Sequence, residues 1–208
     1  MKVLLINGSN KVNGTTNRAL EEVAKELNLN GIETEIFQLG AKPINDCIAC
    51  MQCRTLNNRC VFNNDPVNEL IEKAEKCDGF IFGTPVYYAH PSARILALLD
   101  RVFYAGSSVF AFKPGASVAV ARRAGTVASF DVLNKYMTIA RMPIVSSTYW
   151  NNVHGANSSD AEKDLEGMQI MRTIGRNMAW ILKCIEAGKN AGIDKPEQEE
   201  KIKTNFIR

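Results

Sequence analysis

Short runs of apolar residues alternate with helical patterns along most of this chain. Residues 3–6, 80–83 and 116–121 are runs of aliphatic, aromatic or small side chains with little polar interruption. Such runs are typical of strands buried on both faces of a parallel sheet. Residues 31–37 alternate between apolar and charged positions, which predicts a strand nearer the sheet edge. Residues 142–147 predict a fifth strand, since a proline near the start of a run suits an edge.

Apolar positions at helical spacing follow the predicted strands. Residues 20–27 predict a first helix. Asp65 and Pro66 mark the start of a second, with Asp65 as the N-cap residue and Pro66 as the first helical residue. A broad apolar stripe predicts a last helix over residues 160–187, and Gly188 would end it.

This alternation of strands and helices, without internal repeats, predicts an α/β protein. We expect an open, doubly wound parallel sheet of five strands in the order 2-1-3-4-5, with helices on both faces. The chain has 208 residues, of which 46% are hydrophobic, and this predicts one domain over residues 1–188 and a charged tail over residues 189–208. Such sheets bind ligands at the carboxyl ends of their strands, where the strand order reverses.

A polar loop, residues 7–17, joins the first predicted strand to the first helix. It would place backbone N–H groups and the hydroxyls of Ser9, Thr15 and Thr16 at the positive end of that helix. This arrangement binds a phosphate group without a metal. The alternative is an ordinary turn in which a threonine caps the helix. The loop contains neither G-x-x-x-x-G-K-[ST] nor G-x-G-x-x-G, so it supports neither a nucleoside triphosphatase nor a dinucleotide-binding fold.

The loops after the third and fourth predicted strands belong to the same edge of the sheet. In the first of them, Pro85 stiffens the backbone, and Val86 and Tyr87 offer a flat apolar wall of the kind that a flavin ring needs. The alternative is an ordinary proline-containing loop that carries tyrosines. In the second, the guanidinium groups of Arg122 and Arg123 would bind a phosphate group, unless the two residues form a solvated basic pair.

Four of the six cysteines follow the spacing C-x2-C-x2-C-x6-C, at Cys47, Cys50, Cys53 and Cys60. Four thiolates this close together can ligate an iron-sulfur cube or a zinc ion. Free or redox-active thiols are the third alternative. Because no secretion signal opens the chain, we expect thiols or metal ligands rather than disulfides.

Three of these segments resemble those of a known family. Residues 8–17 are similar to the G-S-x-R-x-x-G-N-T loop that binds the FMN phosphate in NADPH-dependent FMN reductases and iron-sulfur flavoproteins, with Lys11 in place of arginine and Thr15 in place of asparagine. Residues 84–87 and 98–101 resemble the P-V-Y…L-K-x-x-x-D-R block of FMN reductases. The cysteine spacing resembles the motif that holds a [4Fe-4S] cluster in iron-sulfur flavoproteins.

The resemblance implies a flavodoxin-like fold that binds FMN, without an obligatory catalytic side chain because the cofactor carries the chemistry. It implies that the loop after the fourth strand lies along the pyrimidine edge of the flavin, where backbone N–H groups favour the negative charge of the reduced ring. Arg122 and Arg123 would then assist the reduced flavin or bind the phosphate of NADPH. It also implies a homodimer or a homotetramer. The predicted FMN-binding residues are Ser9, Lys11, Gly14, Thr15, Thr16, Asn17, Thr84, Pro85, Val86, Tyr87, Tyr88, Arg122, Arg123, Ala124 and Gly125, and the candidate ligands of a [4Fe-4S] cluster are Cys47, Cys50, Cys53 and Cys60.

Two main functions fit these features. In the first, an FMN-dependent oxidoreductase takes hydride from NADH or NADPH and passes electrons through bound FMN to a small acceptor, such as a quinone, a nitro compound or free flavin. In the second, an electron-transfer carrier with FMN and a [4Fe-4S] cluster relays single electrons from a ferredoxin-like donor. A flavin-binding module that senses redox state is a third, non-enzymatic alternative.

Charge and hydropathy narrow the range of partners. The formal net charge of +3 falls short of the dense basic clustering that binds nucleic acid. No apolar run approaches the roughly 18 residues needed to span a membrane, and no basic segment followed by a long apolar one opens the chain. We therefore expect a cytoplasmic protein with no nucleic-acid or membrane partner.

Overall fold

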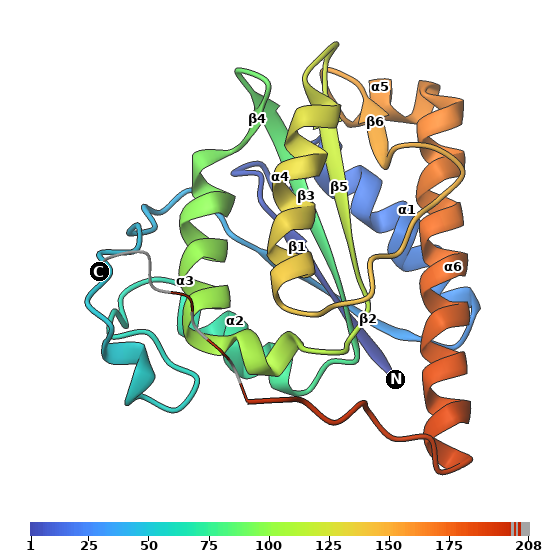
Figure 1. Ribbon diagram of the computed structural model, residues 1–208. Coiled ribbons are helices and arrows are strands. Elements are labelled where there is room, and N and C mark those ends of the chain that lie inside the picture. Colours follow the sequence, from blue (N-terminus) through green and yellow to red (C-terminus); the bar gives the residue numbers. More distant parts are fainter. Residues whose placement is uncertain (201, 203, 205–208) are drawn as a thin grey trace.

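A computed structural model describes residues 1–200, 202 and 204 of the chain. Its centre is a parallel sheet whose strands lie in the order β2-β1-β3-β5-β6, with helices on both sides (Figure 1). The parallel strands are β1 (Lys2–Asn7), β2 (Glu33–Gln38), β3 (Gly79–Tyr87), β5 (Gly115–Ala121) and β6 (Asn152–His154). A two-residue strand, β4 (His90–Pro91), pairs antiparallel with the end of β3. The predicted α/β fold class is confirmed.

The sheet differs from the prediction in the segment that forms its last parallel strand. When β4 is left out and the parallel strands are numbered along the chain, their order is 2-1-3-4-5, as predicted. The fifth of these strands, however, is β6 and not the predicted strand over residues 142–147. The predicted strand over residues 142–147 is wrong, because there the described chain makes one isolated bridge, between Ile144 and Gly115. The Ser147 hydroxyl then bonds locally to the Tyr149 carbonyl, at 2.7 Å, which competes with a sheet ladder. β6 follows after residue 147, at Asn152–His154.

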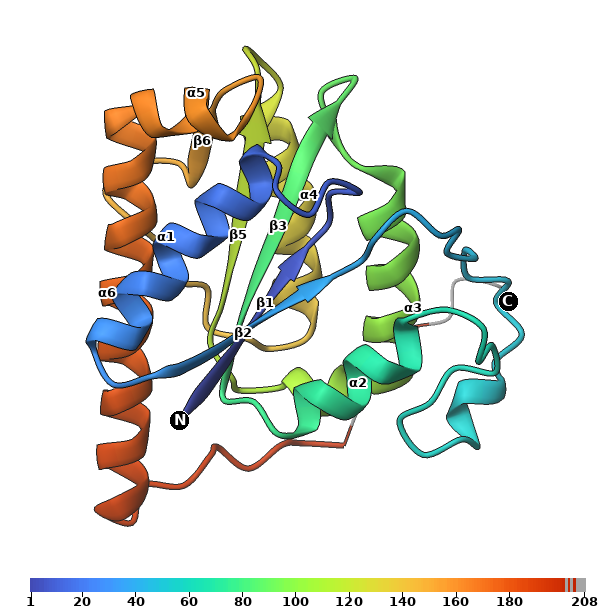
Figure 2. The same cartoon turned by 180° about the vertical axis from the view of Figure 1, so that it is seen from behind.

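Successive residues of the strands face opposite layers of helices. Val3 and Leu5 of β1 belong to one buried core, and Leu4 and Ile6 belong to the other. This period of two, with both faces covered, explains the continuous apolar runs in the sequence. The first core packs under α1 (Thr15–Leu29) and α6 (Leu165–Asn190), and the second packs under α2 (Val67–Glu75), α3 (Ala93–Phe110) and α4 (Thr126–Ile139) (Figures 1 and 2).

Three helix boundaries differ from those predicted. The last apolar stripe is divided between α5 (Ser158–Lys163) and α6, because Asp164 leaves helical geometry. The Asp164 carboxylate caps α6 by accepting a hydrogen bond from the Gly167 N–H at 2.9 Å. α6 then continues past Gly188, and α2 begins one residue later than predicted, with Pro66 at its N-cap position.

The segment between β2 and α2, residues 39–66, carries the four clustered cysteines and is called the cysteine loop below. Its regular structure is a single short 3-10 helix, η1 (Gln52–Arg54). The loop lies beside α2 and α3, on the side of the sheet opposite α6 (Figure 2). None of the helices in the described residues combines the length and the apolarity that crossing a bilayer requires.

The contact between α1 and α6 yields a test of the packing. A Cβ atom on Gly175 would lie 2.7 Å from the Glu26 Cβ and 2.9 Å from the Val23 carbonyl oxygen. We predict that Gly175→Ala lowers the free energy of unfolding in urea by about 1–3 kcal/mol, the usual cost of overpacking. Gly188→Ala is the matched control in the same helix, because its nearest new neighbour would be 3.9 Å away. It should stabilise the protein by up to about 1 kcal/mol, and equal effects of the two substitutions would contradict this packing.

Candidate functional site

The carboxyl ends of β1, β3 and β5 open into one cleft, at the upper edge of the sheet in Figure 1. Its cavity volume of about 320 Å³ is in the range of small-molecule sites, roughly 300–1,000 Å³. The loops after β1, β5 and β6 and the end of β3 form its walls. Nine of the predicted binding residues line it: Ser9, Lys11, Gly14, Thr15, Thr16, Pro85, Val86, Tyr87 and Arg122.

The loop between β1 and α1 is shaped to bind an anion. Gly14 is the N-cap residue of α1 and provides no side-chain cap, so within the described structure the first N–H groups of the helix lack a capping oxygen. The interpretation in which a threonine caps this helix is therefore wrong. The Ser9 Oγ accepts a hydrogen bond from the Lys11 N–H at 3.1 Å, which leaves its own proton for a ligand. Hydroxyls and N–H groups thus converge beside the positive end of α1.

Two carbonyl groups at the start of the same loop accept hydrogen bonds from residues that lie outside the lining of the cleft. The Ser92 hydroxyl donates to the Gly8 carbonyl at 3.0 Å, and the Gln38 amide donates to the Ser9 carbonyl at 2.6 Å. The Gly8 N–H donates to the Gly83 carbonyl at 2.8 Å. A Cβ on Gly8 would lie 2.7 Å from that oxygen, so this turn requires a glycine.

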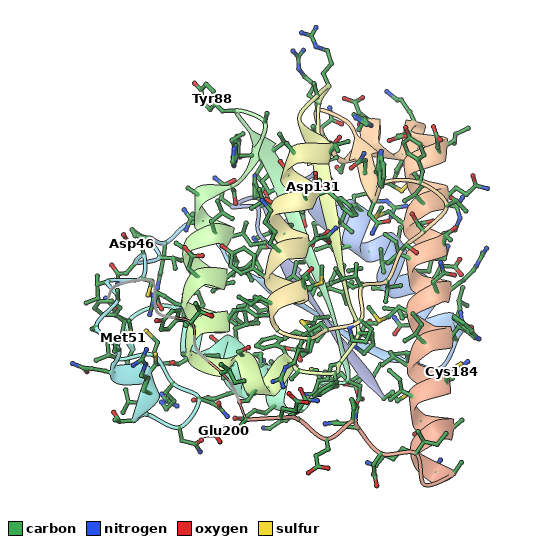
Figure 3. All side chains as sticks on the ribbon, in the orientation of Figure 1. Asp46, Met51, Tyr88, Asp131, Cys184 and Glu200 are labelled. Atoms are coloured by element: carbon green, nitrogen blue, oxygen red, sulfur yellow. The ribbon has the colours of Figure 1, made fainter. Side chains whose placement is uncertain are left out.

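The second wall of the cleft is a hairpin made by the end of β3 and β4. Tyr88 and Ala89 close it with φ of +51° and +59°, a conformation that few residues other than glycine adopt. Tyr87 lines the cleft and is half exposed, whereas Tyr88 is fully exposed and points away from the molecule (Figure 3). Thr84 is buried and accepts a hydrogen bond from the Ser92 N–H at 3.0 Å, so its side chain holds the start of α3.

Four other predicted residues also lie outside the lining of the cleft. Asn17 is buried beneath the loop, and its amide donates to the Glu21 carboxylate at 2.6 Å. Arg123, Ala124 and Gly125 continue the loop after β5 toward α4. Gly125 has φ of +89°, and a Cβ there would lie 2.6 Å from the Ala89 Cα, so this glycine lets the loop pack against the hairpin.

One wall of the cleft was not predicted from the sequence. It is formed by Gly155, Ala156, Asn157 and Ser158, after β6, while Asn13, Val120 and Ala121 complete the lining. The Trp150 ring, shortly before this wall, lies outside the lining of the cleft and packs near Phe130, at 6.1 Å between ring centroids. Asn157 is the residue from which this wall could have been predicted, because asparagine is a common N-cap residue. In the structure it is the N-cap residue of α5 and accepts a hydrogen bond from the Asp160 N–H.

A second, smaller cavity lies between the cysteine loop and α3, and it shares no described lining residue with the cleft. Cys47, Cys50, Cys53 and Cys60 all line it, together with apolar side chains from the loop and from α3. Its volume is about 20 Å³, roughly the space of one water molecule. All six cysteines of the chain are free thiols, and the buried Cys77 and the exposed Cys184 lie outside this cavity.

Four thiol groups line the walls of this cavity. Burial raises the pKa of the Cys53 thiol, and the neighbouring thiols of Cys50, Cys60 and Cys47 raise it further, as expected for groups that share one small volume. A zinc ion would need its thiolates about 2.3 Å away, and the described residues include no three potential ligands gathered around one point. A cube, in contrast, takes each thiolate on a different iron atom.

The strand order, the loop after β1 and the cleft at the carboxyl edge define a flavodoxin-like protein with a site for a phosphate-bearing cofactor. Residues 1–157 match the family model of the NADPH-dependent FMN reductases, and the chain belongs to that family. It is therefore a member of an FMN-binding family of flavin-dependent oxidoreductases, as the loop motifs predicted.

The relatives include proteins with a second cofactor in their names. The chain is 30% identical over 195 residues to an iron-sulfur flavoprotein of Methanocaldococcus jannaschii, with 89% of this chain and 100% of that protein covered. It is 29% identical over 197 residues to the iron-sulfur flavoprotein of Methanosarcina thermophila, with 91% and 100% covered. Among solved structures, a flavodoxin from the domain Archaea has a similar fold, with a TM-score of 0.58 and 12% identity over 88% of this chain and 99% of that one.

The position of Ser9 yields a test of the phosphate loop. We predict that Ser9→Ala raises the dissociation constant of FMN about tenfold, because a hydrogen bond to a charged group contributes about 1.5–3 kcal/mol. Thr173→Ala is the control, since the Thr173 hydroxyl donates to the Gln169 carbonyl on exposed α6. Fluorescence titration with FMN and with riboflavin measures the effect. Weakening of riboflavin by the same factor would show that Ser9 does not contact the phosphate.

Proposed function

We propose that this protein is an electron-transfer flavoprotein that holds FMN in the cleft and a [4Fe-4S] cluster in the cysteine cavity. One observation carries the proposal: the four cysteines of the C-x2-C-x2-C-x6-C motif line one small cavity with mostly apolar walls. Four thiolates in apolar surroundings are the usual ligand set of such a cluster. The full-length similarity to iron-sulfur flavoproteins supports the same conclusion.

The residues of the cleft fit FMN. Ser9, Thr15, Thr16 and the first N–H groups of α1 would hold its phosphate, while Pro85, Val86 and Tyr87 would contact its ring. The hydrogen bonds of the Gly8 and Ser9 carbonyls fix this loop before a ligand arrives, so little conformational freedom is lost on binding. When bound, FMN supplies one-electron and two-electron redox chemistry.

The residues of the cysteine cavity fit a cluster in their chemistry. Cys60 is already a hydrogen-bond acceptor, with the Arg101 Nε at 3.2 Å from its Sγ. The outer wall of the cavity consists of the exposed residues Ile48 and Met51, in a stretch that belongs to no strand (Figure 3, Met51). We expect this wall to move outward when a cube is taken up, since the cavity is now about the size of one water molecule.

Metal analysis of anaerobically purified protein tests the proposal. We expect about four iron and four sulfide per chain, because a cube holds four of each, together with the absorption bands of flavin. Cys53→Ser should remove the iron and leave the flavin, because Cys53 lines the cysteine cavity and not the cleft. Cys184→Ser, on exposed α6, is the matched control and should keep both. Wild-type protein with flavin but without iron, even after reconstitution with iron and sulfide, would contradict the cluster.

A second function, favoured by the open side of the cleft, is the reduction of bound FMN by NADH or NADPH and transfer of its electrons to a small acceptor such as a quinone, a nitro compound or free flavin. Arg122 and the half-exposed Tyr87 line the same cleft, so a cationic side chain belongs to the site that would hold the flavin. A guanidinium group at this position suits the phosphates of a nicotinamide nucleotide. The family name supports the same donor.

Anaerobic stopped-flow reduction tests this second function. We predict rapid bleaching of the bound flavin by NADPH or NADH, and an apparent dissociation constant of the nucleotide that rises about tenfold in Arg122→Ala, since a charge-assisted hydrogen bond contributes about 1.5–3 kcal/mol. Arg123→Ala is the control, because Arg123 is exposed and lies outside the lining. No bleaching by either nucleotide would exclude a nicotinamide donor.

A further inference from the structure

Arg101 of α3 is among the largest fully buried side chains of the protein, with 1% of its surface exposed. Its Nη1 donates to the Asn45 carbonyl at 3.1 Å and to the Asp65 carboxylate. The Phe62 ring covers one face of the guanidinium, 5.0 Å from its central carbon to the ring centroid. One edge and one face of this cation are therefore occupied by groups of the cysteine loop and its C-terminal end.

The other edge of the guanidinium faces the cysteine cavity. Its Nε donates to the Cys60 Sγ at 3.2 Å, and Arg101 is among the residues that line the cavity. Nη2 is buried and has no hydrogen-bond partner within the described residues. In a planar guanidinium, one Nη2–H is parallel to the Nε–H, so the two donors form a fork. The Nε–H of this fork already donates to the Cys60 sulfur, whereas the neighbouring Nη2–H has no acceptor within the described residues.

A buried, unpaired N–H of a charged group costs free energy unless a partner arrives. The partner that this fork requires is a pair of acceptors, the Cys60 sulfur and a second atom next to it in the cavity. A ligated cube offers that pair, a thiolate and an adjacent sulfide. A single thiol group offers one acceptor and leaves Nη2 unsatisfied, as it is in the described structure.

We propose that Arg101 is a positioning residue of the cysteine cavity, whose Nε and Nη2 donate to two sulfur atoms of a bound cluster and raise its reduction potential. This inference rests on the proposed [4Fe-4S] site and goes beyond it, because the motif alone assigns Arg101 no role toward the cysteines. Reduction adds one electron and no proton, so the negative charge on the sulfur atoms increases. N–H donors and a nearby cation stabilise the reduced form more than the oxidised form.

The carboxylate of Asp65 determines how far the reduction potential falls when the Arg101 guanidinium is removed. Its carboxylate is 1% exposed and pairs with Arg101, so removing the guanidinium leaves a buried negative charge near the cluster. Arg101→Gln should therefore lower the equilibrium constant for one-electron reduction by tenfold or more, and each factor of ten is about 59 mV. Arg101→Lys keeps the charge but loses the fork, so its potential should lie between those of the wild type and Arg101→Gln.

Redox titration of the full-length protein, followed by the electron paramagnetic resonance of the reduced cluster, measures these potentials. Arg59→Gln is the matched control, because Arg59 precedes Cys60 but is exposed and pairs with Glu72. Its potential should equal that of the wild type. Iron and sulfide contents are measured in the same samples. Variants that keep four iron and an unchanged potential would overturn the role of Arg101 alone, whereas a wild type without a cluster would overturn the cluster site as well.

A measurement on wild-type protein keeps the proposal testable if both Arg101 variants lose the fold. Protein labelled with ¹⁵N in the arginine guanidino groups should show ¹⁵N coupling to the reduced cluster by electron-nuclear double resonance. Among the described arginines, Arg101 is the one that lines the cavity. Protein labelled in the same way with ¹⁵N lysine should show no coupling. Absence of the arginine coupling in a protein that contains the cluster would overturn the proposal.

Discussion

The cleft depends on how β1 and β3 continue past the end of the sheet. The Gly8 N–H bonds to the Gly83 carbonyl at 2.8 Å, which extends the parallel pairing by one residue before the two chains separate. The β1–α1 loop then turns to one side and β3 runs on into its hairpin, and the cavity lies between them. The absence of a Cβ at Gly8 permits this approach, so the position of the β1–α1 loop follows from a single close backbone contact.

The two candidate sites are formed by different kinds of structural elements. The cleft is built from the carboxyl ends of buried strands, and its walls are held by backbone hydrogen bonds and by N-cap residues. The cysteine cavity is built from an irregular loop against α3, and its main fixed point is the buried pair of Arg101 and Asp65. A redox centre in each would thus be attached to the same sheet through separate elements.

Local features of the sequence were sufficient for much of this structure. The runs at residues 3–6 and 80–82 are buried from both sides, so their apolar character shows directly in the sequence. The loop hydroxyls of Ser9, Thr15 and Thr16 are close in sequence and share one helix end, which is why the lining could be predicted there. Cys47 to Cys60 could be grouped for the same reason.

Features that depend on contacts between residues distant in the sequence could not be predicted from local sequence patterns. Thr84 is polar in the sequence, but its hydroxyl is bound to Ser92, which no local pattern indicates. The turn at Tyr88 and Ala89 has positive φ without glycine or asparagine, so it carries no turn signal. Arg101 reaches Cys60 across 41 positions, and only the packing of α3 brings the two together.

The cysteine loop also has a consequence for how the protein matures in the cell. Between residues 40 and 66 no hydrophobic side chain is fully buried, and the fully buried residues of both hydrophobic cores lie outside this stretch, although Ile44 and Cys60 pack against the second core. Small metal-binding domains often fold only when the metal binds, because the metal replaces a missing core. Here the buried cores lie outside the cysteine loop. For the cluster proposed above, the sheet and its helices would therefore form first, and inorganic iron and sulfide would be inserted into the folded chain afterwards.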